Sequence, residues 1–288
     1  MKRKVKTKVR GFRTIDGAGV NLVRVLGSQT TKEFDPVLML DSFDSINPDD
    51  YTAGFPMHPH RGIETISYVS RGKMVHRDSL GNEDGISDGE VQWMNSGSGI
   101  MHEEMVPAAE RLLGVQLWLN LPSKDKMSKP SYNSIKNDEI DEIEIDGGKI
   151  RLLAGTYGEH QGYKGDYLPM DYYDIHLNAN SEITLTMGGK DSVMIFTLLG
   201  NVYINDEHIE EKTAVKLTEG DSLTIKNGDQ DAQVLYINSR ALNEPVAWAG
   251  PIVMNTQEEL QKACELYQKN QYGRYLKDVL DGKYIDQN

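Results

Sequence analysis

The sequence contains one cysteine, Cys264, among 288 residues, so no intrachain disulfide framework can form. A single thiol fits a reducing compartment, and we expect a cytoplasmic protein. No stretch approaches the roughly eighteen consecutive apolar residues that a membrane-spanning helix needs. The first residues, Met1 to Lys4, are charged but have no apolar stretch behind them, which argues against a secretory signal.

Positive charge is also scarce. The chain has 31 Lys and Arg against 44 Asp and Glu, a formal net charge of −13 and a pI near 5.0. This balance argues against general nucleic-acid binding, which needs a basic face, and against adhesion to an anionic membrane. Hydrophobic residues make up 38% of the chain, enough for a packed core, and its length allows one large or two medium domains. We expect a monomer.

Long helical patterns are largely missing, and short alternating segments separated by glycine turns take their place. The first half contains such segments at residues 20–26, 64–69, 74–77, 90–94 and 114–120. This pattern is typical of an all-β protein built from closed double-sheet barrels. A polar stretch over 122–149 then reads as a linker that ends in an edge strand, and we place the domain boundary there. The basic alternation over 4–10 likewise predicts an edge strand with a solvated face.

The second half repeats the rhythm of the first, which indicates an internal duplication. A turn at Glu219-Gly220-Asp221 matches the turn at Asp88-Gly89-Glu90. The second half has no His-x-His or His-x-Glu pair, and we predict that it binds no metal. Its histidines are isolated in sequence and read as ordinary polar residues: His160, His176 and His208.

One helix is predicted, over residues 256–269, near the end of the chain. Thr256 is suited to be its N-cap, and Glu259 three residues later completes a capping box. An apolar stripe at helical spacing faces the core and makes Cys264 a packed residue rather than a reactive one. The stripe comprises Leu260, Ala263, Cys264 and Tyr267.

Histidines concentrate between residues 58 and 104. Side chains alternate along an extended strand, so His58 and His60 share a face, and His102 shares a face with Glu104. Two such pairs on neighbouring strands would bring three imidazoles and one carboxylate together. This ligand set suits a divalent transition metal such as Fe, Mn, Co, Ni, Cu or Zn. A single His-x-His occurs by chance, but two same-face pairs beside a glycine-rich turn rarely do.

Several motifs surround these residues and extend over most of the chain. They are Phe55–Thr65 with its HPHRG run, His76–Asn82, Gly89–Met94 and Ser96–Met105, with Asp35–Phe43 upstream and Gly250–Thr256 downstream. Together they resemble the pirin family, a branch of the cupin superfamily. The resemblance implies two tandem cupin (jelly-roll) β-barrels with a short C-terminal helix. Residues 1–135 would form a metal-binding barrel, and residues 145–288 a degenerate barrel without metal that includes the helix.

The resemblance also implies that His58, His60, His102 and Glu104 hold one divalent ion, with Fe2+ expected. Glu104 would in addition act in catalysis, by accepting a proton from a bound hydroxyl. Many cupins instead take the carboxylate from the first motif, four residues after its second histidine. Glu64 has that spacing, and is either the ligand itself or a residue beside the pocket.

Two functions follow from the resemblance. The first is a metal-dependent dioxygenase that acts with O2 on quercetin-like flavonols (quercetin 2,3-dioxygenase). The alternative is a non-enzymatic metal-binding regulator that binds protein partners. A cupin enzyme acting on a small sugar or acid is a third, weaker interpretation. Apolar neighbours could line a cavity or equally be plain core: Phe43, Phe55, Met57, Trp93 and Met105.

Overall fold

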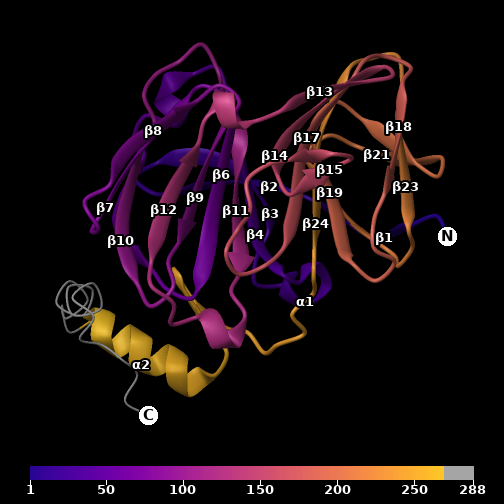
Figure 1. Cartoon of the computed structure of the whole chain (residues 1–288). Helices are drawn as coiled ribbons and strands as arrows, with labels where there is room; N and C mark the ends of the chain where they lie inside the picture. Colours follow the sequence, from indigo (N-terminus) through magenta and orange to yellow (C-terminus); the bar gives the residue numbers. More distant parts are fainter. Residues whose placement is uncertain (269–288) are drawn as a thin grey trace. The chain divides into compact units, whose positions relative to one another are not determined.

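The computed structural model describes residues 1–268, most of which lie in strands or in the turns between them (Figure 1). These residues separate into two compact units. Unit 1 comprises Met1–Arg13, Val23–Ser42 and Ile135–Leu242, and unit 2 comprises Thr14–Leu22, Phe43–Ser134 and the chain from Asn243. Along the described chain, no helix is long and apolar enough to cross a membrane.

Long-range contacts at both ends of the chain determine which unit each end belongs to. Near the start, β1 (Val5–Arg10) pairs antiparallel with β22 (Thr213–Leu217), so the first residues join unit 1. Near the end, the Val253 amide donates to the Arg61 carbonyl at 3.1 Å, which ties β26 (Ile252–Met254) into unit 2. Such long-range pairing leaves no trace in local periodicity. Residues 269–288 of the predicted second domain lie outside the described residues.

Two sheets form the core of unit 1, and the short strands β15 and β16 pair in a third. The larger has the strand order β1-β22-β19-β24-β17-β14-β13, and the smaller has the order β18-β23-β20-β21 (Figure 1). Its further elements are α1 (Thr31–Phe34), η3 (Asn137–Glu139), β13 (Glu142–Ile145), β14 (Gly148–Ala154), β15 (Thr156–Tyr157), β16 (His160–Gln161), β17 (Met170–Leu177), β18 (Glu182–Thr186), β19 (Ser192–Leu199), β20 (Val202–Ile204), β21 (Glu207–Ile209), β23 (Ser222–Asn227) and β24 (Ala232–Ser239). The strands β1 and β13 are its edges, as their charged alternation predicted.

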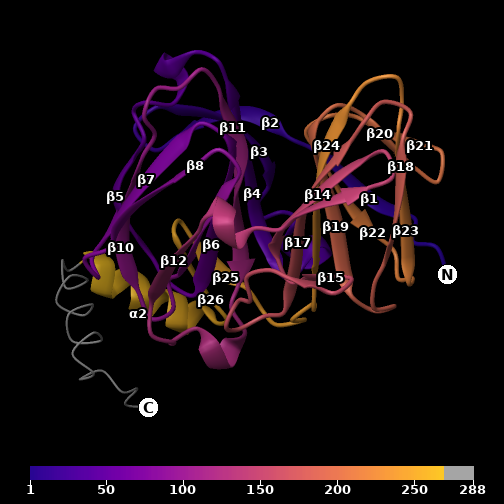
Figure 2. The same cartoon turned by 45° about the horizontal axis from the view of Figure 1, so that its top comes forward.

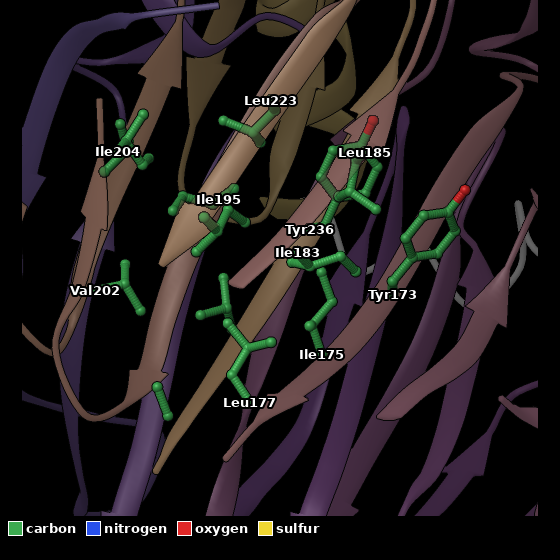
Figure 3. Close-up of a cluster of buried hydrophobic side chains, with 14 of the residues drawn as sticks. Tyr173, Ile175, Leu177, Ile183, Leu185, Ile195, Val202, Ile204, Leu223 and Tyr236 are labelled. Carbon is green, nitrogen blue, oxygen red and sulfur yellow. The ribbon is translucent and has the colours of Figure 1, made fainter. Parts of the chain in front are cut away.

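The interior of unit 1 is apolar. Both sheets contribute to one buried cluster, in which Ile195 and Tyr236 from the larger sheet meet Leu223 from the smaller one (Figure 3). The rings of Tyr173 and Tyr236 stack with centroids 4.9 Å apart. Burying each such side chain contributes about 1.5–3 kcal/mol, so hydrocarbon and tyrosine rings hold this unit together.

Unit 2 combines a four-stranded sheet, β5-β10-β7-β8 (Figure 2), with four consecutive strands of a second sheet, β12-β9-β6-β11 (Figure 1). Met74 and Ile86 of the first sheet pack with Val69 of the second in one apolar cluster. The elements are η1 (Pro48–Asp50), β5 (Phe55–His60), β6 (Ile63–Arg71), β7 (Lys73–Asp78), β8 (Glu83–Ser87), β9 (Glu90–Asn95), β10 (Ile100–Met105), β11 (Leu112–Asn120), η2 (Ser123–Asp125), β12 (Ser131–Ile135, all but its last residue), β25 (Ala247–Ala249), β26 and α2 (Gln257–Gln268). Residues of β2 (Phe12–Asp16), β3 (Val20–Leu26) and β4 (Val37–Ser45) are divided between the units.

The prediction for residues 122–149 needs correction. The stretch over 122–149 is not simply a linker, because its residues 131–135 form β12 and extend a sheet beside β9.

The helix α2 has the predicted capping box: the Glu259 amide donates to Thr256 Oγ1 at 3.2 Å, and the Thr256 amide donates to the Glu259 carboxylate at 2.9 Å. Leu260 and Ala263 pack as expected, but Tyr267 is 45% exposed. The predicted last helical residue, Lys269, lies outside the described residues.

Candidate metal centre

Two paired strands bring the three histidines together. In the ladder between β5 and β10, His102 lies directly opposite His58, and Ile100 lies opposite His60. The imidazole centroids of His58 and His102 are 4.4 Å apart, and those of His60 and His102 are 5.0 Å apart. One nitrogen from each ring falls in a group whose members all lie within 4.8 Å of one another. The histidine pair of β5 and the single histidine of β10, which alternation along the strands predicts to face one site, therefore converge.

The proton positions of His58 and His60 follow from their hydrogen-bond partners. His58 Nδ1 lies 2.8 Å from the Pro56 carbonyl oxygen, and His60 Nδ1 lies 3.1 Å from the Pro251 carbonyl oxygen. A carbonyl oxygen can only accept, so both Nδ1 atoms carry the proton. Both Nε2 atoms then present lone pairs, and these two atoms lie 3.1 Å apart. Two lone pairs at this separation repel each other unless a cation lies between them.

The third imidazole contributes a buried nitrogen. His102 is 1% exposed, and within the described part of the chain its Nε2 has no hydrogen-bond partner. Its other nitrogen, Nδ1, lies 3.4 Å from Nδ1 of His76. A buried nitrogen without a partner is costly in a folded protein, and metal coordination is one way to satisfy it.

Burial keeps the imidazoles of His60 and His102 neutral. Removal from water, reinforced by the neighbouring His58, lowers the pKa of His60 to about 3. Burial and the adjacent histidines His60, His58 and His76 hold the pKa of His102 well below its usual range. Metal ligation requires neutral imidazole, so the environment holds the side chains in their ligating form. The Trp118 indole also packs on His60 in a T-shaped arrangement, with ring centroids 4.9 Å apart, and restrains that ring.

Glu104 lies on β10 with His102, inside unit 2, and its carboxylate accepts hydrogen bonds from two side-chain amides. Gln116 Nε2 donates to both carboxylate oxygens, at 2.9 and 3.1 Å, and Gln92 Nε2 makes a short bond to Oε1. The Ser67 hydroxyl lies 3.4 Å from the same oxygen. The convergent group found among the described residues consists of the three histidines, without Glu104. The structure thus orients this carboxylate by hydrogen bonds, and its role as a fourth ligand stays a proposal.

Glu64 is not beside the histidines, contrary to the alternative that its spacing suggested. On β6, Ser67 faces Glu104, and Glu64 at three residues' distance faces the opposite side of the sheet. Its carboxylate accepts a hydrogen bond from Trp93 Nε1 at 3.0 Å, and Trp93 likewise has opposite parity to Gln92. The parity prediction failed because Gly62, at φ +78°, turns the chain between β5 and β6. Trp93 is therefore not a lining residue of this site.

The remaining parity prediction for β10 is confirmed. Glu103 points away from the histidines and lies 3.7 Å from Arg77 in an ion pair on the other face.

Met57 and Met105, at 49% and 39% exposure, are only partly covered, while Phe43 belongs to the apolar core. The second-half histidines make ordinary polar contacts: His160 with Asp141 at 2.8 Å and His176 with Asp174 at 2.7 Å.

A further layer of residues around the site was not predicted from the sequence. His76 and Asp78 lie on β7, beside β10, and Gln92 and Gln116 hold Glu104. The spacing His76-x-Asp78 repeats the same-face pattern of the histidine pairs and could have indicated the first two. Nothing in the sequence singles out Gln116 or the carbonyl of Pro251, because these contacts depend on pairing between distant segments.

The two sheets of each unit and the histidine cluster of unit 2 define a protein of the cupin class with two cupin domains. Comparison with known proteins gives the particular family. A family model described as Pirin matches residues 19–119, and one described as Pirin C-terminal cupin domain matches residues 172–273. The chain belongs to the pirin family.

Individual relatives agree with this assignment. The chain is 36% identical to pirin of Homo sapiens in an alignment of 271 residues that covers 91% of each chain. It is 38% identical to a Pseudomonas aeruginosa protein provisionally named a quercetin 2,3-dioxygenase, over 89% of this chain and 93% of that protein. The crystal structure of a protein named quercetin 2,3-dioxygenase, from Acinetobacter baumannii, superposes with a TM-score of 0.87 at 30% identity, covering 95% and 99% of the two chains.

Proposed function

We propose that this protein is a metal-dependent dioxygenase that acts on quercetin-like flavonols, using one divalent ion, Fe2+, held by His58, His60, His102 and Glu104. The observation that carries the proposal is the convergence of three imidazoles, with a buried carboxylate on the same strand as His102. The name given to the similar Acinetobacter baumannii protein, quercetin 2,3-dioxygenase, supports the choice of substrate class. We further propose that it works as a monomer in the reducing cytoplasm, with Cys264 as a free thiol.

The residues fit such an ion on chemical grounds. The Nδ1 atoms of His58 and His60 are committed to backbone carbonyls, which leaves Nε2 of each ring as the ligating atom. Imidazole nitrogen suits Fe, Mn, Co, Ni, Cu and Zn, so the ligand set alone does not select iron. When bound, the ion supplies positive charge that lowers the pKa of a coordinated hydroxyl.

Glu104 then has a clear task as proton acceptor for the 3-hydroxyl of the flavonol. A carboxylate within reach of the departing proton typically contributes about 10²–10⁴-fold to a rate. Gln92 and Gln116 orient that carboxylate by donating hydrogen bonds to it, and as neutral amides they add no charge of their own. Loss of the proton makes the flavonol ring electron-rich, which prepares it for reaction with O2.

The proposal is tested with quercetin and the metal-loaded protein. We expect loss of the flavonol absorbance together with O2 uptake, both abolished when a chelator removes the metal. A His160→Gln variant serves as a control, because His160 lies on the surface of unit 1, where it contacts Asp141. If the loaded protein leaves quercetin and related flavonols unchanged, the proposal is wrong, and a metal-binding regulator of protein partners becomes the better account.

A further inference from the structure

A second carboxylate, Asp78, and a fourth histidine, His76, lie next to the candidate metal centre, and the proposed function gives neither of them a role. We propose that His76 and Asp78 are positioning residues that fix the tautomer of His102, so that its Nε2 presents a lone pair to the metal. This inference rests on the proposed function, because it assigns a task to residues around the same ion.

The strand ladder places these groups in line. In the pairing of β7 with β10, Asp78 lies opposite His102 and His76 lies opposite Glu104. Directly paired residues of antiparallel strands project to the same face, so all four side chains point into unit 2. His76 and His102 are 0% and 1% exposed, so neither ring is in contact with bulk water.

The positions of the protons on His76 and His102 follow from Asp78, the last residue in this series of contacts. His76 Nε2 lies 2.9 Å from Oδ2 of Asp78, whose carboxylate can only accept. His76 therefore donates from Nε2, and in a neutral ring its Nδ1 is an acceptor.

The proton of the next ring is fixed in the same way. His76 Nδ1 lies 3.4 Å from His102 Nδ1, and of two facing nitrogens one must donate while the other accepts. With His76 as the acceptor, His102 carries its proton on Nδ1, and its buried Nε2 is left with a lone pair. This is the atom that has no hydrogen-bond partner among the described residues. In His58 and His60 a backbone carbonyl fixes the tautomer, and in His102 a second imidazole takes that place.

Both outer residues are held firmly. The Asp78 Oδ1 atom accepts from the amides of Leu80 and Asn82, at 2.8 and 3.1 Å, and Oδ2 accepts from Asn82 Nδ2 at 2.8 Å. The His76 ring stacks on Tyr132 with centroids 4.0 Å apart and planes 10° from parallel. A rigid carboxylate and a clamped ring leave His76 with one orientation, as a positioning residue requires.

The first test reads the tautomers directly. Protein loaded with Zn2+, which is diamagnetic, is labelled with 15N, and the ring nitrogens are assigned by NMR. We expect His102 to be protonated on Nδ1 and coordinated through Nε2, and His76 to be protonated on Nε2 with Nδ1 unprotonated. Coordination of His102 through Nδ1, or a proton on Nδ1 of His76, would overturn the proposal. This measurement uses the unaltered protein, so no variant has to fold for it to decide.

A second test measures Zn2+ affinity with a chelator in competition. His76→Phe keeps the stacking on Tyr132 but removes the acceptor, and we expect about a 10–100-fold loss of affinity. His76→Asn places an amide oxygen near the position of Nδ1 and should restore most of it. His208→Gln, at an exposed position of β21, is the matched histidine control and should not change the affinity.

The two proposals fail in different ways. If His58→Ala binds Zn2+ as tightly as the unaltered protein, the metal centre itself is wrong, and this inference fails with it. If His58→Ala loses the ion but His76→Phe retains full affinity, the metal centre stands and only the positioning role of His76 is refuted. Rescue by asparagine separates a hydrogen-bonding role from simple packing, since asparagine fills the space less well than phenylalanine.

Discussion

The Nε2 atoms of His58 and His60 lie 3.1 Å apart, although each ring already uses its Nδ1 proton to bind a backbone carbonyl. Neither Nε2 can donate to the other, so the contact is not a hydrogen bond between neutral rings. A cation or an added proton resolves the repulsion. Because burial lowers the pKa of His60 to about 3, protonation is unfavourable at neutral pH and a metal ion is the better solution.

The same burial makes the metal-free protein sensitive to acid. An unfolded histidine has a pKa near 6.5, so below about pH 6.5 the unfolded chain binds a proton that folded His60 does not. Stability is therefore fully present above that pH and falls as the pH drops toward 3, by up to about 1.4 kcal/mol per pH unit for this residue.

Urea unfolding of chelator-treated protein across this pH range measures the effect. We expect the free energy of unfolding of the unaltered protein to fall more steeply with acidification than that of His60→Gln, which has no titrating ring at this position. Parallel curves for the two proteins would show that His60 is not buried in its neutral form.

Glu104→Gln separates ligation from proton transfer. Three imidazoles remain in this variant, so we expect it to lose less metal affinity than His102→Ala. Its flavonol turnover should nevertheless fall by about 10²-fold or more, because the amide cannot accept the substrate's proton. Turnover is compared at equal metal occupancy by O2 uptake. Activity close to that of the unaltered protein would remove Glu104 from the reaction.

Lys126 supports the segment that follows the first histidine motif. Its buried ammonium donates to the carbonyls of Gly62 and Val253, at 2.8 and 3.1 Å, and to Asn120 Oδ1 at 2.7 Å. Lys126→Met leaves these buried acceptors unsatisfied, and we expect a loss of about 2–4 kcal/mol in the free energy of unfolding.

Denaturant titration of Lys126→Met and of Lys124→Met gives the comparison, because Lys124 is exposed and should change stability by less than about 0.5 kcal/mol. Equal stability of the two variants would contradict this role for Lys126.

Much of this arrangement could be predicted from the sequence, since alternation on a strand is a strict local rule. It placed His58 with His60, and it placed Glu103 on the face opposite Glu104. The capping box of α2 followed from Thr256 and Glu259 for the same reason, as four consecutive residues determine it.

The failures occur where the chain turns or where distant segments meet. Glu64 does not lie on the predicted face, the one that the histidines occupy, because the turn at Gly62 breaks the alternation between β5 and β6. The pairing of β1 with β22 and the contact of Val253 with Arg61 join residues far apart in sequence, so no local pattern reports them. For the same reason the hydrogen bond from Gln116 to Glu104 was not foreseen.

Metal analysis of the purified protein tests the central claim most directly. After loading with Fe2+ and removal of excess ion, elemental analysis should find one divalent ion per chain. His60→Ala and His102→Ala should each lose most of it while keeping the circular dichroism spectrum of a folded β protein, and His160→Gln should keep it all. Folded His60→Ala and His102→Ala proteins that retain the full ion, or an unaltered protein that binds none, would contradict the account.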